Sequence, residues 1–402
     1  MSSDAFYDLA SSSWDDEERL VVQRVFAEGR LTMGEYVRRF EEAFAAKLGM
    51  KHAVMTNSGS SANLVGIAAL FHRRARPLRR GDEVIVPAVS WATTYHPLQQ
   101  YGLKLRFVDV ELETLNMDVS RLEAALTPRT RMVVAVSILG NPAALDVMRA
   151  FCDAHDLILF EDNCESMGSS LAGRACGTFG DVTTFSTFYS HQISTMEGGV
   201  LLTNDTEIDH LSRAIRNHGW TRDVPPGTIY ERSDDGFNEA YRFVVPGYNL
   251  RPLEVCGALG LVQLAKLDGI VEARRANAAQ FVRLFAGDAR FIIQREHGRS
   301  SWFSFTIVLN PLLEISRADV LGALRESGIA FRMITGGCFL RHEAIRFFEY
   351  DTVGPIVNAH LVHDRGFFVG NHPRNLGPEL DRLRSVLDRA VGASLSTATP
   401  GS

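Results

Sequence analysis

The stretch Phe185-Ser-Thr-Phe-Tyr-Ser-His-Gln-Ile-Ser-Thr-Met-Glu-Gly-Gly199 joins two short apolar runs, at 182–185 and 199–203. Such runs are typical of buried strands, so the polar residues between them predict a loop at the edge of a sheet. His191 lies in this loop, and an imidazole can take up and release a proton near neutral pH. Lysine occurs only at positions 47, 51, 104 and 266, far from the loop in sequence. We therefore predict a proton-transfer site at His191.

Apolar runs on both sides of this loop predict seven strands, at 53–57, 83–87, 105–109, 132–137, 157–161, 182–185 and 199–203. Helix-length segments separate the first five of them. Repeated strand–helix–strand units indicate an α/β fold with a largely parallel sheet. Ligands of such sheets bind beyond the carboxyl ends of the strands, and the candidate site residues fall at these positions.

A turn of small residues, Ser58-Gly-Ser-Ser-Ala-Asn63, follows the first strand and opens a helix. The first turn of a helix has free N–H groups that suit a phosphate. Gly59 would allow close approach of the backbone, and Ser60 would add a hydroxyl. Taken alone, the pattern is also typical of an ordinary N-cap turn, so it favours phosphate binding only together with the other motifs.

Three further side chains follow predicted strands. Trp91 comes just after the second strand, where its face could stack on a pyridine ring, although a core or interface tryptophan would look the same. Asp162 ends the strand at 157–161, and Glu165 follows three residues later. Both carboxylates could alternatively belong to the start of a helix.

The composition excludes several classes of function. The chain has 402 residues, a net charge of −6 and 46% hydrophobic residues, enough for a large core. It has no long basic run, so we expect no nucleic-acid partner, and no apolar run of membrane-spanning length. Five scattered cysteines without a C-x-x-C motif, and an N-terminus unlike a signal peptide, favour a cytoplasmic protein without a metal site.

The remaining segments suggest four regions. An acidic N-cap signature at Ser13-Trp-Asp-Asp-Glu-Glu predicts a helix to about Glu28, and a long amphipathic helix is predicted at about 254–280. The predicted regions are an N-terminal arm (1–30), a large domain (31–265), a small C-terminal α/β domain (266–391) and a disordered tail (392–402).

Across almost the whole chain the sequence resembles the DegT/DnrJ/EryC1/StrS family of nucleotide-sugar aminotransferases. The motifs that carry this resemblance are Thr32-Met-Gly-Glu-Tyr-Val, Pro87-Ala-Val-Ser-Trp, Pro97-Leu-Gln-Gln-Tyr-Gly-Leu, Glu161-Asp-Asn-Cys-Glu-Ser-Met-Gly, Phe188-Tyr-Ser-His, Thr195-Met-Glu-Gly-Gly, His218-Gly-Trp-Thr-Arg, Pro246-Gly-Tyr-Asn and Phe368-Val-Gly-Asn-His. In the aminotransferases a lysine that binds pyridoxal phosphate (PLP) stands where this chain has His191. The sugar dehydratases of the family also have histidine there.

The resemblance implies fold type I of the PLP enzymes, as in aspartate aminotransferase, with a seven-stranded, mostly parallel sheet domain and a small C-terminal α/β domain. It also implies a role for each matching residue. Trp91 would stack on the cofactor ring, Asp162 would pair with the ring nitrogen, and Glu165 would contact the ring oxygen. Gly59, Ser60 and Ser186 would hold the phosphate, and Asn249 of a second subunit would complete that site in a homodimer. On the substrate side the resemblance implies Ser190, His218, Arg222 and Arg251.

The expected reaction removes the C3 hydroxyl of a nucleotide-linked 4-keto-6-deoxyhexose, with GDP-4-keto-6-deoxy-D-mannose as the favoured substrate. Without a lysine, the resting cofactor would be pyridoxamine phosphate (PMP), which L-glutamate would regenerate. His191 would act first as base and then as acid. Gln192 departs from the family dehydratase, which has a second histidine there.

Three alternatives stay open from the sequence. The chain could be an aminotransferase that uses histidine, or a reductive 3-dehydrase that needs an iron–sulfur cluster and a reductase partner. It could also be an inactive scaffold subunit that has kept the fold. The scattered cysteines argue against the second, and the retained Trp91, Asp162 and phosphate turn argue against the third.

Overall fold

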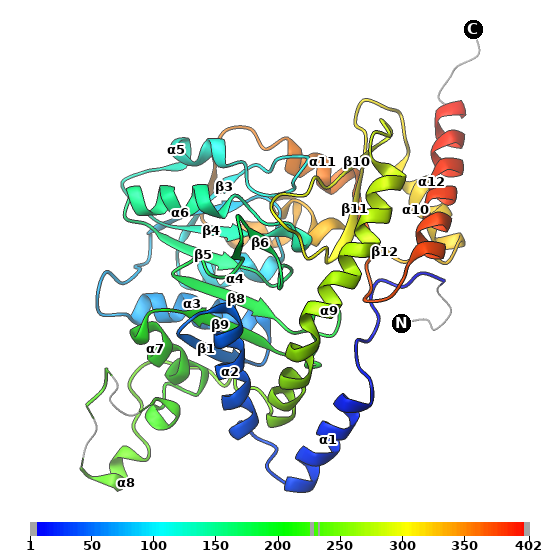
Figure 1. Ribbon diagram of the computed structural model, residues 1–402. Coiled ribbons are helices and arrows are strands. Elements are labelled where there is room, and N and C mark those ends of the chain that lie inside the picture. The colour runs from blue at the N-terminus through cyan, green and yellow to red at the C-terminus, as the bar shows by residue number, and fades with distance from the viewer. Residues whose placement is uncertain (1–5, 226–228, 232–233, 398–402) are drawn as a thin grey trace.

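The computed structural model describes residues 6–225, 229–231 and 234–397 and is built around an eight-stranded sheet (Figure 1). Every neighbouring pair in it is parallel except the two pairs that β9 forms, with β1 and β8. In spatial order the strands are β1 (His52–Thr56), β9 (Gly199–Thr203), β8 (Val182–Ser186), β5 (Ile158–Asp162), β4 (Thr130–Val136), β2 (Glu83–Pro87), β3 (Lys104–Val108) and β13 (Tyr350–Thr352).

Helices cover both faces of this sheet, which is why its central strands are apolar at almost every position. Successive side chains of a strand point to opposite faces. Val84 and Val86 accordingly pack in one core cluster and Ile85 in another. The helices on the first face are α3 (Gly59–His72), α4 (Ala92–Gln100) and α7 (Thr206–Arg216), and those on the second include α2 (Glu35–Leu48), α5 (Leu122–Ala125) and α6 (Leu145–Ala154).

A helix of 32 residues, α9 (Glu254–Phe285), links the large sheet to the rest of the chain (Figure 1). Its first part packs with α2, β1 and β9 through residues such as Leu259 and Leu264. Its last part contributes Phe281 and Phe285 to a different core. The N-terminal helix α1 (Asp16–Glu28) packs along the first part. The predicted domain boundary between residues 265 and 266 falls inside α9. Because the helix runs through it without interruption, this boundary stays a prediction.

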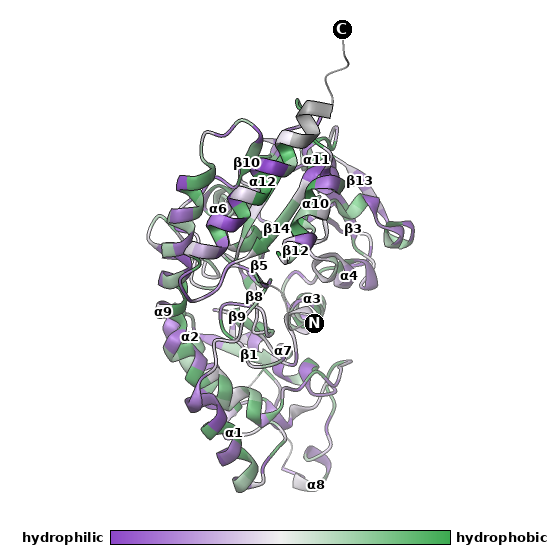
Figure 2. Cartoon of the chain, turned by 90° about the vertical axis from the view of Figure 1, so that its right-hand side faces the viewer, coloured by the Kyte–Doolittle hydropathy of each residue, from purple (hydrophilic) through white to green (hydrophobic). Residues whose placement is uncertain are grey.

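The second core belongs to a four-stranded antiparallel sheet, in the order β10 (Phe291–Ile293), β11 (Ser304–Leu309), β14 (Gly366–Gly370) and β12 (Phe331–Arg332). Its helices are α10 (Arg317–Glu326), α11 (Asn358–Arg365) and α12 (Gly377–Thr397). Figure 2 shows the hydrophobic strand β14 beside helices that carry polar residues as well. The remaining short elements are β6 (Ser170–Leu171), β7 (Arg174–Ala175) and α8 (Gly236–Glu239).

The predicted α/β fold with a large, mostly parallel sheet and a smaller domain is confirmed, with two corrections. The large sheet has an eighth strand, β13, because the chain returns from the small domain and pairs with β3. The tail expected to be disordered from residue 392 is helical as far as Thr397, since no proline interrupts the chain before Pro400. Residues 398–402 lie outside the described part of the chain, whose helices include none apolar and long enough to cross a bilayer.

Candidate active site

A cavity of about 470 Å³ opens at the carboxyl ends of β2, β5 and β8, and residues of the small domain close one side of it. Eight residues predicted from the sequence line it: Gly59, Ser60, Trp91, Asp162, Glu165, Ser186, Ser190 and His191. The small domain contributes Phe303, Arg332, Thr335 and Phe368. The cavity therefore lies where a doubly wound sheet binds its ligands.

The turn before α3 is shaped for close approach to a ligand. Ser58 caps the helix by accepting a hydrogen bond from the Ser61 N–H at 3.1 Å, so the chain turns sharply at Gly59. A Cβ on Gly59 would lie 2.7 Å from the Cβ of Ser186 and 2.8 Å from the Sγ of Cys164. Glycine thus lets β8 approach the helix N-terminus closely, which places the Ser186 side chain beside the helix dipole.

Asp162 is held in one orientation by three donors. Its Oδ2 accepts hydrogen bonds from Asn63 Nδ2 at 2.9 Å and from Thr94 Oγ1 at 2.7 Å. Its Oδ1 accepts one from the Cys164 N–H at 3.2 Å. The Asn63 amide is oriented in turn by Thr184, whose hydroxyl donates to Asn63 Oδ1 at 2.6 Å. This carboxylate is 5% exposed and faces the cavity, as a partner for a buried cationic ring nitrogen must.

His191 is half-buried against two aromatic rings. The centroid of its imidazole lies 5.1 Å from that of Phe303 and 6.0 Å from that of Phe188, both in edge-to-face geometry. Burial, and second the positive charge of Arg274, lower the pKa of His191 well below its usual range. The imidazole is therefore neutral at physiological pH and can act as a base. Its neighbour Gln192 is buried and donates to the Glu165 carbonyl at 2.7 Å.

Glu165 joins the two domains across the cavity. Its Oε2 accepts from the Leu139 N–H at 2.9 Å and from the Thr335 hydroxyl of the small domain at 3.3 Å. Leu139 and Thr335 have φ values of 50° and 43°, so both donors sit on backbone in the left-handed region. Burial raises the pKa of Glu165 to about 7. This carboxyl group therefore loses its proton in the physiological range and not near pH 4.5.

We expect Glu165→Gln to stabilise the ligand-free protein at alkaline pH. In the unfolded chain the carboxyl ionises near its ordinary pKa, so wild-type protein loses stability as the pH rises from there through 7. Glutamine cannot ionise. Its free energy of unfolding should exceed that of wild type by about 3 kcal/mol at pH 8, and not at pH 4. Urea unfolding at both values measures the difference.

The control for this experiment is Glu113→Gln, because Glu113 is exposed and pairs with Arg295 on the surface. It should differ from wild type by less than about 1 kcal/mol at both pH values, because an exposed ion pair contributes little to stability. An unchanged free energy of unfolding for Glu165→Gln at pH 8 would contradict the raised pKa.

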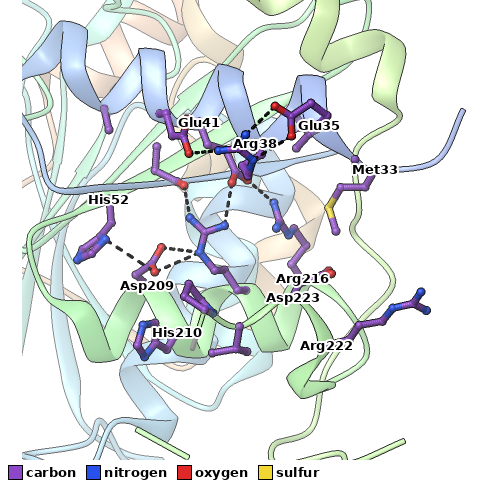
Figure 3. Close-up of a pocket in the computed structure, with 18 of the residues that line it drawn as sticks. Met33, Glu35, Arg38, Glu41, His52, Asp209, His210, Arg216, Arg222 and Asp223 are labelled. Atoms are coloured by element: carbon purple, nitrogen blue, oxygen red, sulfur yellow. Dashed lines mark hydrogen bonds and ion pairs between the residues drawn. The ribbon is translucent and has the colours of Figure 1, made fainter. Parts of the chain in front are cut away.

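Four predicted residues, Asn249, His218, Arg222 and Arg251, do not line this cavity. Asn249 pairs with Asn217 and accepts from Arg251 Nε at 3.0 Å. Arg222 lines a separate pocket of about 770 Å³, in which Arg216 and Arg213 pair with the buried Glu41 (Figure 3). In this view Arg222 extends away from the ion-paired cluster. Within one chain these four residues are therefore separate from His191.

The sequence also left several cavity residues unassigned. Asn63 and Thr94 orient Asp162, yet neither stands out in sequence because polar residues are common in the first turns of helices. Thr184, which orients Asn63 from inside β8, is equally inconspicuous. Phe303 and Thr335 come from the small domain, over 100 residues from His191 along the chain, so only tertiary structure joins them to the loop. The sequence did contain a signal for Asn63. This residue lies four positions after Gly59 and thus on the same face of α3, which points it to the same site.

Comparison with known proteins identifies the class to which this fold and site belong. The model of the DegT/DnrJ/EryC1/StrS aminotransferase family matches residues 12–382, so the chain belongs to this family, as its motifs predicted.

Within the family, the chain is 46% identical over 386 residues to the GDP-4-keto-6-deoxy-D-mannose 3-dehydratase of Yersinia pseudotuberculosis, which covers 95% of this chain and 98% of that protein. It shares the fold of the solved Escherichia coli GDP-4-keto-6-deoxy-D-mannose-3-dehydratase with bound hydrated PLP. The TM-score is 0.93, the sequence identity is 46%, and the match covers 95% of this chain and 99% of that chain. A further structure of GDP-4-keto-6-deoxymannose-3-dehydratase, with a trapped PLP-glutamate geminal diamine, has the same identity and TM-score and covers 95% of this chain and 100% of that chain.

Proposed function

We propose that this chain is a PLP- and PMP-dependent 3-dehydratase that acts on a GDP-linked 4-keto-6-deoxyhexose, with L-glutamate as amino donor. The observation that carries the proposal is a neutral histidine, His191, in a cavity that has the features of a PLP site and no lysine among its described lining residues. The relatives that are 46% identical bear the name of this activity. The substrate is accordingly GDP-4-keto-6-deoxy-D-mannose.

The cavity fits the cofactor on observations of this structure. Asp162 is buried, oriented and turned to the cavity, the turn at Gly59 leaves room for a phosphate, and Trp91 is 59% exposed with a face available for stacking. When bound, the cofactor would supply an electron sink for breaking bonds next to the sugar ketone. The residues that would hold it are Gly59, Ser60, Ser186, Trp91, Asp162 and Glu165.

His191 moves the proton in this proposal. Because it is neutral, it can accept a proton from a group bound beside it in the cavity. The imidazolium so formed would then give that proton to the C3 hydroxyl of the sugar, whose oxygen would leave as water. Phe188 and Phe303 hold the ring edge-on, which limits its rotation while the proton is carried. Ser190, with Oγ 3.5 Å from His191 Nδ1, also lines the cavity and would be available to the substrate.

Mass spectrometry of the products tests the proposal directly. The protein is incubated with PLP, L-glutamate and a panel of GDP-, dTDP-, CDP- and UDP-linked 4-keto-6-deoxysugars. We expect the GDP-linked mannose derivative to give a 3-deoxy-4-keto sugar, with one oxygen fewer, and 2-oxoglutarate. A 4-amino sugar as the main product would identify an aminotransferase, and no turnover with any sugar would leave a scaffold protein.

Two active sites shared by a homodimer would explain why four predicted residues lie outside the cavity of their own chain. Asn249, His218, Arg222 and Arg251 belong to the segment 217–251, which also exposes large apolar side chains. Further apolar residues are exposed at and near the cavity, including Trp91, Phe188 and Leu253. A second copy that covered both surfaces would bury them and bring Asn249 to the phosphate of the partner's cofactor.

We expect subunit mixing to restore activity lost in two single variants. His191→Asn removes the base of one site and Asn249→Ala the phosphate contact offered to the other. In a mixed dimer, one site would combine an intact His191 with an intact Asn249. Co-refolded variants should therefore regain a substantial part of wild-type activity, about half per mixed dimer. No gain on mixing, or a fully active monomer in sedimentation, would contradict shared sites.

A further inference from the structure

Arg274, near the middle of α9, is buried directly behind the His191 loop. The residue is 4% exposed, and its guanidinium donates to the Phe303 carbonyl at 2.9 Å and to the His191 carbonyl at 3.3 Å. It also lies 5.7 Å from the centroid of the Phe303 ring, whose edge-to-face partner is His191. One positive charge is thus tied to both the main chain and the packing partner of the proposed base.

This charge has no carboxylate partner among the residues that the structure describes, and its Nε has no hydrogen-bond partner there. The other buried arginine among the described residues, Arg216, is compensated, because it pairs with Glu41 at 2.5 Å. Burying an unpaired guanidinium costs several kcal/mol, and a well-packed apolar side chain would avoid that cost. Arg274 therefore carries a cost in stability that its hydrogen bonds to two carbonyls only partly offset.

We propose that Arg274 is a positioning residue that fixes the His191 loop and whose uncompensated charge destabilises the protonated imidazole, which makes His191 a readier proton donor to the leaving hydroxyl. This inference rests on the proposed dehydratase function. The proton that His191 has accepted must leave it again in each cycle. A fixed positive charge nearby drives the transfer to the C3 oxygen, because it raises the energy of the imidazolium and leaves the neutral ring unaffected.

Other charged groups also surround His191, but Arg274 is the charged group that shifts its pKa. Asp162, Glu165, Glu197 and Arg332 line the same cavity. Asp162 is occupied by three donors, and burial raises the pKa of Glu165 to about 7 and also raises that of Glu197. His372, on the far side of Arg274, is bound to Ser11 and to the Asp8 carbonyl. Arg274 is the second-largest cause, after burial, of the lowered pKa of His191.

The test titrates His191 itself in cofactor-free protein labelled with [¹³C]histidine, using His191→Asn to assign its signal by NMR. Arg274→Met and Arg274→Gln remove the charge, and glutamine keeps a donor for a carbonyl. In either variant the pKa of His191 should rise by about one unit, a tenfold gain in proton affinity. Arg274→Lys, which keeps the charge, should leave it near the wild-type value. One soluble neutral variant is enough for the comparison.

Turnover supplies a second measurement. Because a base is lost when it is protonated, a higher pKa moves the acidic limb of the kcat profile to higher pH. His191 stays neutral at pH 7 in both proteins, so kcat at neutral pH falls only through slower proton donation to the C3 oxygen, with little change in KM. Arg275→Met is the matched control, since Arg275 also donates to buried carbonyls, of Ser300 and Gly168, but pairs with Glu272. An equal loss of activity in all Arg274 variants, with an unchanged pKa of His191, would overturn the proposal. The titration of His191 needs no substrate, so its result does not depend on which sugar the protein uses.

Discussion

Replacing His191 with asparagine is expected to abolish removal of the C3 hydroxyl, by at least about 10³-fold, while the cofactor still binds. An amide has a size close to that of imidazole but cannot take up a proton at neutral pH. The groups that would hold the cofactor are untouched, because Asp162 is oriented by Asn63, Thr94 and Cys164. Stopped-flow measurement of one turnover from the PMP form separates elimination from the later reaction with glutamate.

Two further variants, one at the same position and one control, show whether this loss is due to the chemistry of His191. His191→Lys should form a covalent bond with the cofactor aldehyde, visible as an absorbance band that borohydride fixes, and should dehydrate poorly because its amine is engaged. His155→Asn, at a histidine beside Glu123 on the far side of the molecule, should behave as wild type. If His191→Asn still eliminated near the wild-type rate, a water or another residue would be the proton carrier.

Asp162→Asn is expected to slow both half-reactions by about 100-fold or more, the usual effect of losing one preorganised electrostatic partner. A neutral amide cannot keep a ring nitrogen protonated, so the bound cofactor would be a weaker electron sink. We expect the variant to fold. Asn63 and Thr94 both donate to Oδ2 of Asp162, and the amide oxygen of asparagine can accept the same two hydrogen bonds. Cofactor binding through the phosphate turn should survive as well.

The matched control is Asp146→Asn, an exposed carboxylate in the first turn of α6. Rates of the two half-reactions are measured separately, as the loss of PMP with the sugar and its return with glutamate. Full activity of Asp162→Asn in both would mean that another group pairs with the ring nitrogen.

The parts of this fold that sequence predicted are those in which local pattern and tertiary burial agree. The central strands are mostly apolar because helices cover both faces, and the turn at Gly59 must be small because Ser186 lies against it. β13 could not be predicted, since Tyr350, Asp351 and Thr352 are exposed and polar enough for a loop. Its strand conformation comes from pairing with β3 and from the Lys104–Asp351 ion pair.

The candidate site divides in the same way. Residues on the loops after strands were predictable, because all such loops of a parallel sheet meet at one edge. Arg274 was not, since a sequence such as Ala273-Arg-Arg-Ala276 in a long helix is typical of a solvated face. Only the packing of Phe303 and the His191 loop against α9 shows which of the two arginines is buried. Thr335 was hidden for a similar reason, because its donor role depends on a left-handed backbone.

The continuity of α9 has a consequence for how the molecule can be taken apart. Leu259 and Leu264 of this helix are anchored in the large sheet's core, and Phe281 and Phe285 in the small one. Separating the two units would require breaking the helix between Leu264 and Phe281 or exposing one set of anchors. The small domain therefore cannot simply be exchanged for that of another protein. A chimaera joined within α9 must preserve the length of this helix, because inserting a single residue would turn Phe281 and Phe285 by about 100° relative to Leu259 and Leu264.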